Sequence, residues 1–293
     1  MIKSFKELDN NLLIEICTHY EQNHDFDALK EKFPFLDHIT LYSALHSTGL
    51  YDQELYNCLC QESITDKKII FISDTHYGSI YENMRYTYEV FNYAAANGIH
   101  IIFHGGDILA ANVNQRRRFS HLKQANYFIR EYPHDSSITT HALFGNHDYI
   151  SIDRNPEVRD ILSSRSDIKT LGFKKAYIKW NGNVISLQHE IEKYKLNIPI
   201  NAEYLSFKGH SHFYHIRERK GTKCERIYIP AMCDAPITSV VKNQVKRSDV
   251  VMKPGFLTAE IDDDRIIVSD YSFNQHGVMK EHEFQKVLKR KDN

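Results

Sequence analysis

The chain has 293 residues and a formal net charge of −1, with 42% hydrophobic and 12% aromatic residues. This length and apolar content suffice for one large folded domain, or for a large and a small one. No stretch approaches the roughly 18 consecutive apolar residues of a membrane-spanning helix, and residues 1–10 lack the apolar core of a signal peptide. We therefore expect a cytoplasmic protein with no membrane partner.

The charge is unevenly distributed along the chain. Residues 1–66 contain 4 Lys/Arg and 12 Asp/Glu, a net charge of −8, whereas the remaining residues carry +7. Two parts of opposite charge suggest two domains with a boundary near residue 66. The five cysteines are an odd number and form no CxxC pair, so reduced thiols are expected rather than a disulfide framework or a structural zinc site.

The N-terminal part is expected to form a small all-α domain. Apolar residues at helical spacing predict a helix over residues 3–20, and a short second helix over 25–32 ends before Pro34. A third helix is predicted from Asp37, as N-cap, to Ser47. Three short helices with tight turns resemble a helix-turn-helix unit. The third helix has no Lys or Arg to neutralise phosphates, which favours a packing or homodimerisation module over a DNA-binding one.

After residue 66 the pattern alternates between strand and helix, which is typical of α/β proteins. Helices are predicted at roughly 80–97 and 114–131, and a β-rich region after Gly182 includes a hairpin around residues 262–264. Residues 276–293 are expected to form a charged tail or helix. The short apolar runs that predict strands are Lys68–Ser73, His100–His104, Ile138–Phe144, Val184–Gln188 and Tyr204–Phe207.

Each of these five runs is followed directly by a polar segment. Ligands of α/β sheets bind beyond the carboxyl ends of the strands, so one fold can gather the five segments at one edge. Mixed Asp and His donors suit divalent Mn, Fe, Co, Ni or Zn, and two such ions held together make a site for in-line attack on phosphorus. The five segments are Asp74-Thr75-His76, Gly106-Asp107, Gly145-Asn146-His147-Asp148, His189 and Gly209-His210-Ser211-His212.

In this order, the segments resemble the pattern of the calcineurin-like metallophosphoesterase superfamily, which is D-x-H, GD, GNH[D/E], a lone His after a strand, and GHxH. The resemblance covers about residues 68–275. It implies a four-layer α-β-β-α sandwich over 67–275, after the helical domain of residues 1–66. It also implies a hydrolase of ester bonds with two divalent metal ions, Mn being the first choice and Fe, Zn, Co or Ni the alternatives. A hydroxide between the two ions would attack the phosphate ester.

The same resemblance assigns roles to single residues. His147 would bind no metal but would lie over the substrate phosphate, stabilise its developing charge and protonate the leaving oxygen. Adjacency in the sequence suggests that Asp148 orients His147. The implied ligand sets are Asp74, His76 and His212 for one ion, Asn146, His189 and His210 for the other, and Asp107 as a bridge between both.

The residues around the ligands bear on the substrate. Ser/Thr protein phosphatases extend GD to GDxxDRG, and the residues after Asp107 do not, which argues against that branch. In nuclease and phosphodiesterase branches the lone His usually precedes Gly, whereas here Glu190 follows His189. Positive charge and aromatic rings near the ligands favour a nucleotide or nucleic-acid phosphodiester, although a solvated helix face and core packing explain them equally well or better. The candidate contacts are Tyr77, Arg116, Arg117, Tyr149 and Phe213.

Two other functions stay open at this point. One is a nucleic-acid-binding regulator that uses an inactive phosphoesterase domain as a scaffold. The other is a phosphomonoesterase with an N-terminal dimerisation module.

Overall fold

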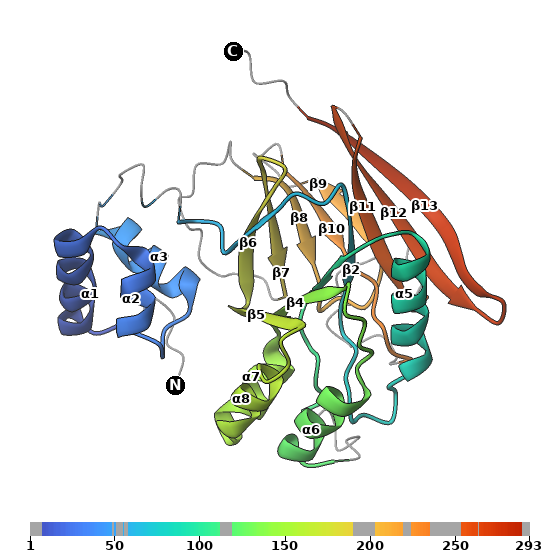
Figure 1. The fold of residues 1–293 in the computed structure, drawn as a ribbon, viewed down its shortest axis with the longest axis horizontal. Coiled ribbons are helices and arrows are strands. Elements are labelled where there is room, and N and C mark those ends of the chain that lie inside the picture. The colour runs from blue at the N-terminus through green and yellow to red at the C-terminus, as the bar shows by residue number, and fades with distance from the viewer. Residues whose placement is uncertain are drawn as a thin grey trace.

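The structure is a computed structural model. It describes residues 8–48, 50, 55, 58–111, 119–189, 203–218, 224–234, 253–262 and 264–288. Two β-sheets form the centre of the molecule, with helices on the outside of one sheet and three short helices beside the other (Figure 1). Among these residues, no helix is both long and apolar enough to cross a lipid bilayer. The expected mixed α/β sandwich with a small all-α N-terminal part is confirmed.

The N-terminal helices begin at aspartate N-caps. Asp9, Asp25 and Asp37 each accept a hydrogen bond from the backbone N–H three residues on, at 2.7–3.1 Å. The predicted N-cap at Asp37 is therefore confirmed, and the cap at Asp9 explains why the first helix begins later than predicted from its apolar spacing. The three helices are α1 (Asn10–Asn23), α2 (Phe26–Lys32) and α3 (His38–Ser47).

These helices share a small apolar core that extends onto the neighbouring sheet. Ile16, Leu29 and Leu41 are fully buried in it, and Tyr177 and Val184 of the six-stranded sheet pack against the same cluster. The N-terminal helices therefore contact the outer face of that sheet at two of its strands.

The seven-stranded sheet has four parallel and three antiparallel strands. Its order is β13-β12-β11-β2-β3-β4-β5, in which β2 to β5 run parallel and β11 to β13 are added antiparallel beside β2. Three of the parallel strands match predicted ones to within a residue. The strands are β2 (Lys68–Ile72), β3 (Ile101–His104), β4 (Thr139–Phe144), β5 (Ile168–Phe173), β11 (Gly255–Asp262), β12 (Arg265–Asn274) and β13 (Gly277–Val287).

The six-stranded sheet packs on the first through apolar side chains. Phe71 and Phe103 stack with ring centroids 5.4 Å apart, and Phe71 stacks on Phe207 of the other sheet at 3.7 Å. These ring contacts hold the two sheets together near the strand ends that carry the polar segments. The strands of the six-stranded sheet, in sheet order, are β1 (Glu62–Ile64), β6 (Lys175–Trp180), β7 (Asn183–Gln188), β8 (Glu203–Lys208), β10 (Glu225–Tyr228) and β9 (His215–Glu218).

Helices cover the outer face of the seven-stranded sheet. Val90, Phe128 and Val158 from three of them are fully or almost fully buried against the strands. The predicted helix at 80–97 begins four residues later and ends one residue earlier than predicted. That at 114–131 begins at His121, after its N-cap Ser120, and residues 112–118 lie outside the described residues. The helices are α5 (Met84–Ala96), α6 (His121–Glu131), α7 (Asn146–Arg154) and α8 (Glu157–Leu162).

The two ends of the expected domain division differ from the structure. Residues 62–64, assigned to the N-terminal part, form β1 and pair with β6. Residues 277–287, expected as a charged tail or helix, form β13 and pair antiparallel with β12. The charges of this segment suit an edge strand, where Lys and Glu side chains reach solvent, and Phe284 anchors it to the core between the sheets.

Candidate metal centre

The five polar segments meet at one edge of the two sheets. Each follows the carboxyl end of its strand, and backbone hydrogen bonds tie the segments together. Asp74 N–H donates to Gly106 O at 2.9 Å. His210 N–H donates to Asp74 Oδ2 at 2.9 Å, and His147 N–H donates to Asp107 Oδ1 at 2.9 Å. The structure therefore brings together all seven residues that the sequence proposes as metal ligands.

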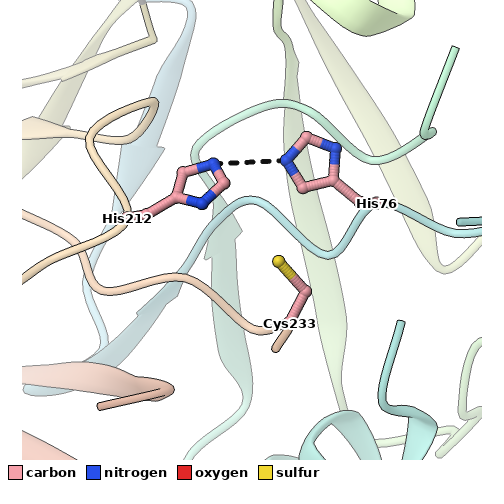
Figure 2. Close-up of side chains that lie close together, drawn as sticks. All are labelled: His76, His212 and Cys233. Atoms are coloured by element: carbon pink, nitrogen blue, oxygen red, sulfur yellow. Dashed lines mark hydrogen bonds between the residues drawn. The ribbon is translucent and has the colours of Figure 1, made fainter. Parts of the chain in front are cut away.

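A first cluster of donor atoms contains Asp74, His76 and His212. The two Nε2 atoms lie 3.3 Å apart, and Asp74 Oδ1 lies 3.3 Å from His212 Nε2 and 3.9 Å from His76 Nε2. Donors held at about 2.0–2.2 Å from one ion are about 3–3.6 Å apart. Figure 2 shows the two imidazoles facing each other, with the thiol of Cys233 directed toward the same gap. The spacing is that of ligands around a common cation.

A second cluster contains Asp107, Asn146, His189 and His210. His189 Nε2 lies 3.1 Å from both Asp107 Oδ2 and Asn146 Oδ1, and His210 Nδ1 lies 3.1 Å from the same amide oxygen. His189 Nδ1–H donates to Gly105 O at 2.7 Å, because a carbonyl oxygen only accepts. This contact fixes the ring and leaves Nε2 to face the cluster.

Asp107 takes part in both arrangements. One of its carboxylate oxygens and one ring nitrogen each of His189 and His210 lie within 4.8 Å of one another. The same holds for Asp107 with His76 and His147. His147 Nδ1–H donates to Ala110 O at 2.9 Å, which directs Nε2 toward Asp107 Oδ2 at 3.7 Å. His147 is 18% exposed on its side chain, whereas Asp107 is buried. The imidazole therefore stands at the open side of the centre.

The backbone at this edge is unusually strained. Five of the residues just described have positive φ between 47° and 69°, a region that costs a non-glycine residue roughly 1–2 kcal/mol. Such strain concentrates at functional sites, where the surrounding structure enforces it. The five are Asp74, His76, Asp107, His210 and His212.

Glycines allow the loops to approach this closely. A Cβ on Gly106 would lie 2.5 Å from His189 Nδ1, and one on Gly145 would overlap the Asp107 carboxylate and lie 2.8 Å from His189 Cδ2. Gly106 also has φ +99°, which a side chain disfavours. The glycines that precede Asp107 and Asn146 in the sequence are therefore required by contact.

The electrostatics of the centre call for positive charge. Burial opposes ionisation of Asp107, but His189 and His147 outweigh it and hold its pKa well below the usual range. Burial likewise opposes the charged form of His189, yet the Asp107 carboxylate raises the pKa of His189 to about 10. Burial and the neighbouring His147 lower the pKa of His76 to about 3. Two buried carboxylates beside a neutral imidazole form an environment that stabilises cations.

A divalent metal ion fits this donor set. Asp74 Oδ1 is fully buried and accepts no hydrogen bond, and Nδ1 of His76 and of His212 is also buried without one. Buried polar atoms normally have partners, and a cation between Asp74 Oδ1 and the two Nε2 atoms would satisfy the carboxylate. Asp and His are donors for borderline divalent ions.

Residues 67–230, more than half of the chain, match the family model described as calcineurin-like phosphoesterase. The chain belongs to the calcineurin-like phosphoesterase family.

Solved structures with a similar fold have low sequence identity to this chain. Wild-type Vps29 of Entamoeba histolytica complexed with Zn²⁺ is 14% identical, with a TM-score of 0.41 over 74% of this chain and 98% of that one. A novel archaeal phosphodiesterase is 15% identical, with a TM-score of 0.39 over 75% and 99%. Vps29 of Chaetomium thermophilum is 10% identical, with a TM-score of 0.43 over 76% and 97%. A search of curated proteins gave no match.

Asp148 makes different contacts from the ones expected. It does not contact the His147 ring, which is held by Ala110 instead. Its fully buried carboxylate accepts hydrogen bonds from the N–H groups of Ile108, Leu109 and Gly145 at 2.8–3.1 Å. Adjacent residues at the start of a helix point in different directions, so adjacency alone misleads here. Asp148 joins the loops that carry Asp107 and Asn146.

Two of the expected substrate contacts are core residues. Tyr77 is 2% exposed and packs edge-on against Phe128, and Phe213 is 4% exposed and stacks on Tyr228. Neither ring offers a face to a substrate, so these two interpretations are wrong. Tyr149 is half-buried against the helix layer. Arg116, Arg117 and Glu190 lie outside the described residues.

Cys233 is the residue at the centre that sequence reasoning missed. It follows β10 and is 3% exposed, with its Sγ near His76 and His212. The family pattern ends at His212, twenty-one residues earlier in the chain, and a single cysteine has no spacing signal of its own. His104 was also missed. It is buried, with Nε2 3.0 Å from Thr75 Oγ1, and it supports the loop before Asp107.

Proposed function

We propose that this phosphoesterase hydrolyses phosphate esters with two divalent metal ions, and that nucleotide or nucleic-acid phosphodiesters are its substrates. One observation carries the proposal. Seven side chains converge into two donor clusters that share Asp107. A shared carboxylate draws two cations together, which is the arrangement used for in-line attack on phosphorus.

The ligands divide as the geometry groups them. Asp74, His76 and His212 would hold the first ion, Asn146, His189 and His210 the second, and Asp107 both. Two ions bound there would supply an activated water and positive charge for the phosphate oxygens. The amide oxygen of Asn146 would coordinate the ion without adding negative charge, so the loaded centre would keep enough positive charge to attract a phosphate.

His147 acts on the substrate rather than on the ions in this proposal. Its Nδ1–H is held by Ala110 O, so Nε2, 3.7 Å from Asp107 Oδ2, is left to meet a substrate bound over the centre. In the imidazolium form, Nε2–H can donate to a phosphate oxygen and then pass its proton to the leaving oxygen. Asp107 Oδ1 accepts a hydrogen bond from the His147 backbone N–H, which keeps the two residues side by side.

We assign the organic part of the substrate to a recess whose lining includes Tyr214, two residues after His212 in the chain. This cavity of about 480 Å³ is also lined by two ion pairs, Lys253 with Glu281 and His282 with Asp270. Tyr214 and His282 stack with ring centroids 5.6 Å apart. Mixed charge and an aromatic pair suit a nucleoside better than a long polyanion, and Arg116, Arg117 and Tyr149 stay predicted contacts.

A substrate panel tests the proposal. The chain, supplied in turn with Mn²⁺, Zn²⁺ and Co²⁺, is assayed on bis-aryl phosphate, aryl monophosphate, cyclic nucleotides and nucleic acid. Asp107→Asn and His147→Ala are expected to lose at least about 100-fold in kcat, since removal of one electrostatic or acid–base group typically costs that much. The exposed His276→Ala serves as the control. Undiminished turnover in both variants would refute the mechanism.

The alternative of DNA reading by α3 has no support in the burial pattern. Residues 40–46 of that helix are all buried, and their side chains include no Lys or Arg. We retain the homodimer as part of the proposal, since Ile14 of α1 and Phe35 of the turn between α2 and α3 are 63% and 46% exposed. Sedimentation of the full chain and of Ile14→Lys tests it, and monomers in both cases would remove it. The cytoplasmic location is likewise part of the proposal.

A further inference from the structure

Cys233 borders the first donor cluster. Its Sγ and the donor nitrogens of His76 and His212 all lie within 4.8 Å of one another. Figure 2 shows the thiol directed toward the gap between the two imidazoles. The cysteine is 3% exposed and the histidines are 5% and 8% exposed, so all three side chains face an interior space.

The backbone fixes the thiol at this place. Met232 N–H donates to Ser73 O at 3.0 Å, directly before Asp74, and Asp234 N–H donates to Tyr81 O at 2.9 Å. Cys233 itself forms an antiparallel bridge with Glu82. The residues on both sides of the cysteine are therefore anchored to the segment that carries Asp74 and His76.

A second observation points to a cation in the same gap. Asp74 Oδ1 is fully buried and accepts no hydrogen bond, although it lies 3.3 Å from His212 Nε2. Cysteines buried for packing alone behave as small apolar groups. Cys233 instead faces two imidazoles, which are metal donors themselves.

We propose that Cys233 is a further protein ligand of the first metal position and makes that position selective for zinc over manganese. The inference rests on the proposed dinuclear site. Sulfur and nitrogen donors around one zinc ion lie roughly 3–4 Å apart, and Cys233 Sγ lies within 4.8 Å of both donor nitrogens. The thiol releases its proton to solvent as the metal–sulfur bond forms. Thiolates favour zinc, and the second cluster has only oxygen and nitrogen donors, so the two positions differ in preference.

Cobalt substitution tests this directly. Co²⁺ is titrated into the metal-free wild type, into Cys233→Ser and into the control Cys224→Ser, which removes another buried thiol. A thiolate-to-cobalt charge-transfer band in the near ultraviolet is expected in the wild type and the control, and not in Cys233→Ser. Zinc affinity of Cys233→Ser is expected to fall about 10- to 100-fold, while manganese affinity stays within about threefold of the wild-type value.

Each outcome decides the proposal. Two cobalt ions without the band, or a band that survives in Cys233→Ser, overturns the role of Cys233 and leaves the dinuclear phosphoesterase intact. A wild type that binds no ion overturns both. If Cys233→Ser does not fold, X-ray absorption of the zinc-loaded Cys224→Ser protein replaces it. A zinc–sulfur distance near 2.3 Å supports the proposal, and only nitrogen and oxygen at about 2.0–2.1 Å refutes it.

Discussion

Replacing Gly145 with alanine adds one methyl group at the point where both donor clusters meet. Gly145 has φ −89° and ψ −171°, which any residue adopts, so the backbone itself tolerates alanine. The new Cβ would overlap the Asp107 carboxylate and lie 2.8 Å from His189 Cδ2. Asp107, His189 or the helix α7 must therefore move by several tenths of an ångström.

The size of the effect follows from these contacts. Overpacking of a dense interior costs about 1–3 kcal/mol, and the poorer N-cap adds up to about 1 kcal/mol. The sum corresponds to a fall in melting temperature of roughly 5–15 °C. Metal ligands must keep their distances to within about 0.2 Å, so affinity is expected to fall about 100-fold. Because Asp107 belongs to both clusters, both ions should weaken together.

The assay pairs thermal melting of the metal-free protein with titration of Zn²⁺ or Mn²⁺ against a chelating indicator. Gly98→Ala is the control, since Gly98 has φ +61° and no atom within 4 Å of an added Cβ. That change should cost about 1–2 kcal/mol of stability from backbone strain and leave metal affinity unaltered. If Gly145→Ala binds both ions as tightly as the wild type, the role given to the glycine contact is wrong.

Three further results are expected. Metal binding near pH 7 should release at least about one proton, because, against the opposing effect of burial, the Asp107 carboxylate raises the pKa of His189 to about 10, and His189 must lose that proton to bind. Affinity should then rise with pH, and calorimetry in buffers of different ionisation enthalpy that shows no release would contradict this. Asp148→Ala leaves three buried N–H groups unpaired and should lower the free energy of unfolding in urea by about 3 kcal/mol or more. The control Asp153→Ala, at an exposed position, should lower it by less than about 0.5 kcal/mol. Asp37→Ala removes the N-cap of α3 and should cost about 1 kcal/mol, whereas Asp37→Asn, which keeps an acceptor, should not; equal losses in both would refute the capping argument.

Three of the four parallel strands of the seven-stranded sheet, and the candidate metal centre, were predictable from local sequence. Apolar β-branched runs such as Ile69–Ile72 predict a buried strand, and the polar residues that follow must lie at its carboxyl end. Five such junctions therefore locate the centre before any contact is known. Short helices with aspartate caps, such as the one that begins after Asp37, are predictable for the same local reason.

Elements that depend on distant partners were not predictable in this way. β5 and β6 contain Lys169, Gly172 and Lys175, which weaken a strand pattern, and their pairing with β4 and β7 decides their conformation. Two of the hydrogen bonds of Asp148 join residues 39 and 40 positions apart, and only the one with Gly145 is local, at three positions. The contact of Cys233 with His76 likewise depends on how β10 returns to β2, which no local pattern encodes.

The left-handed residues of the centre have a consequence for the protein inside a cell. Five positions at about 1 kcal/mol each amount to on the order of 5 kcal/mol, comparable to the whole stability of many domains. Ions that bind only the folded chain offset that cost by mass action. The folded fraction, and with it the rate at which proteases remove the chain, should therefore follow the supply of divalent metal. The cellular amount of this protein would then rise and fall with the concentration of available divalent metal, even where the amount of its substrate stays constant.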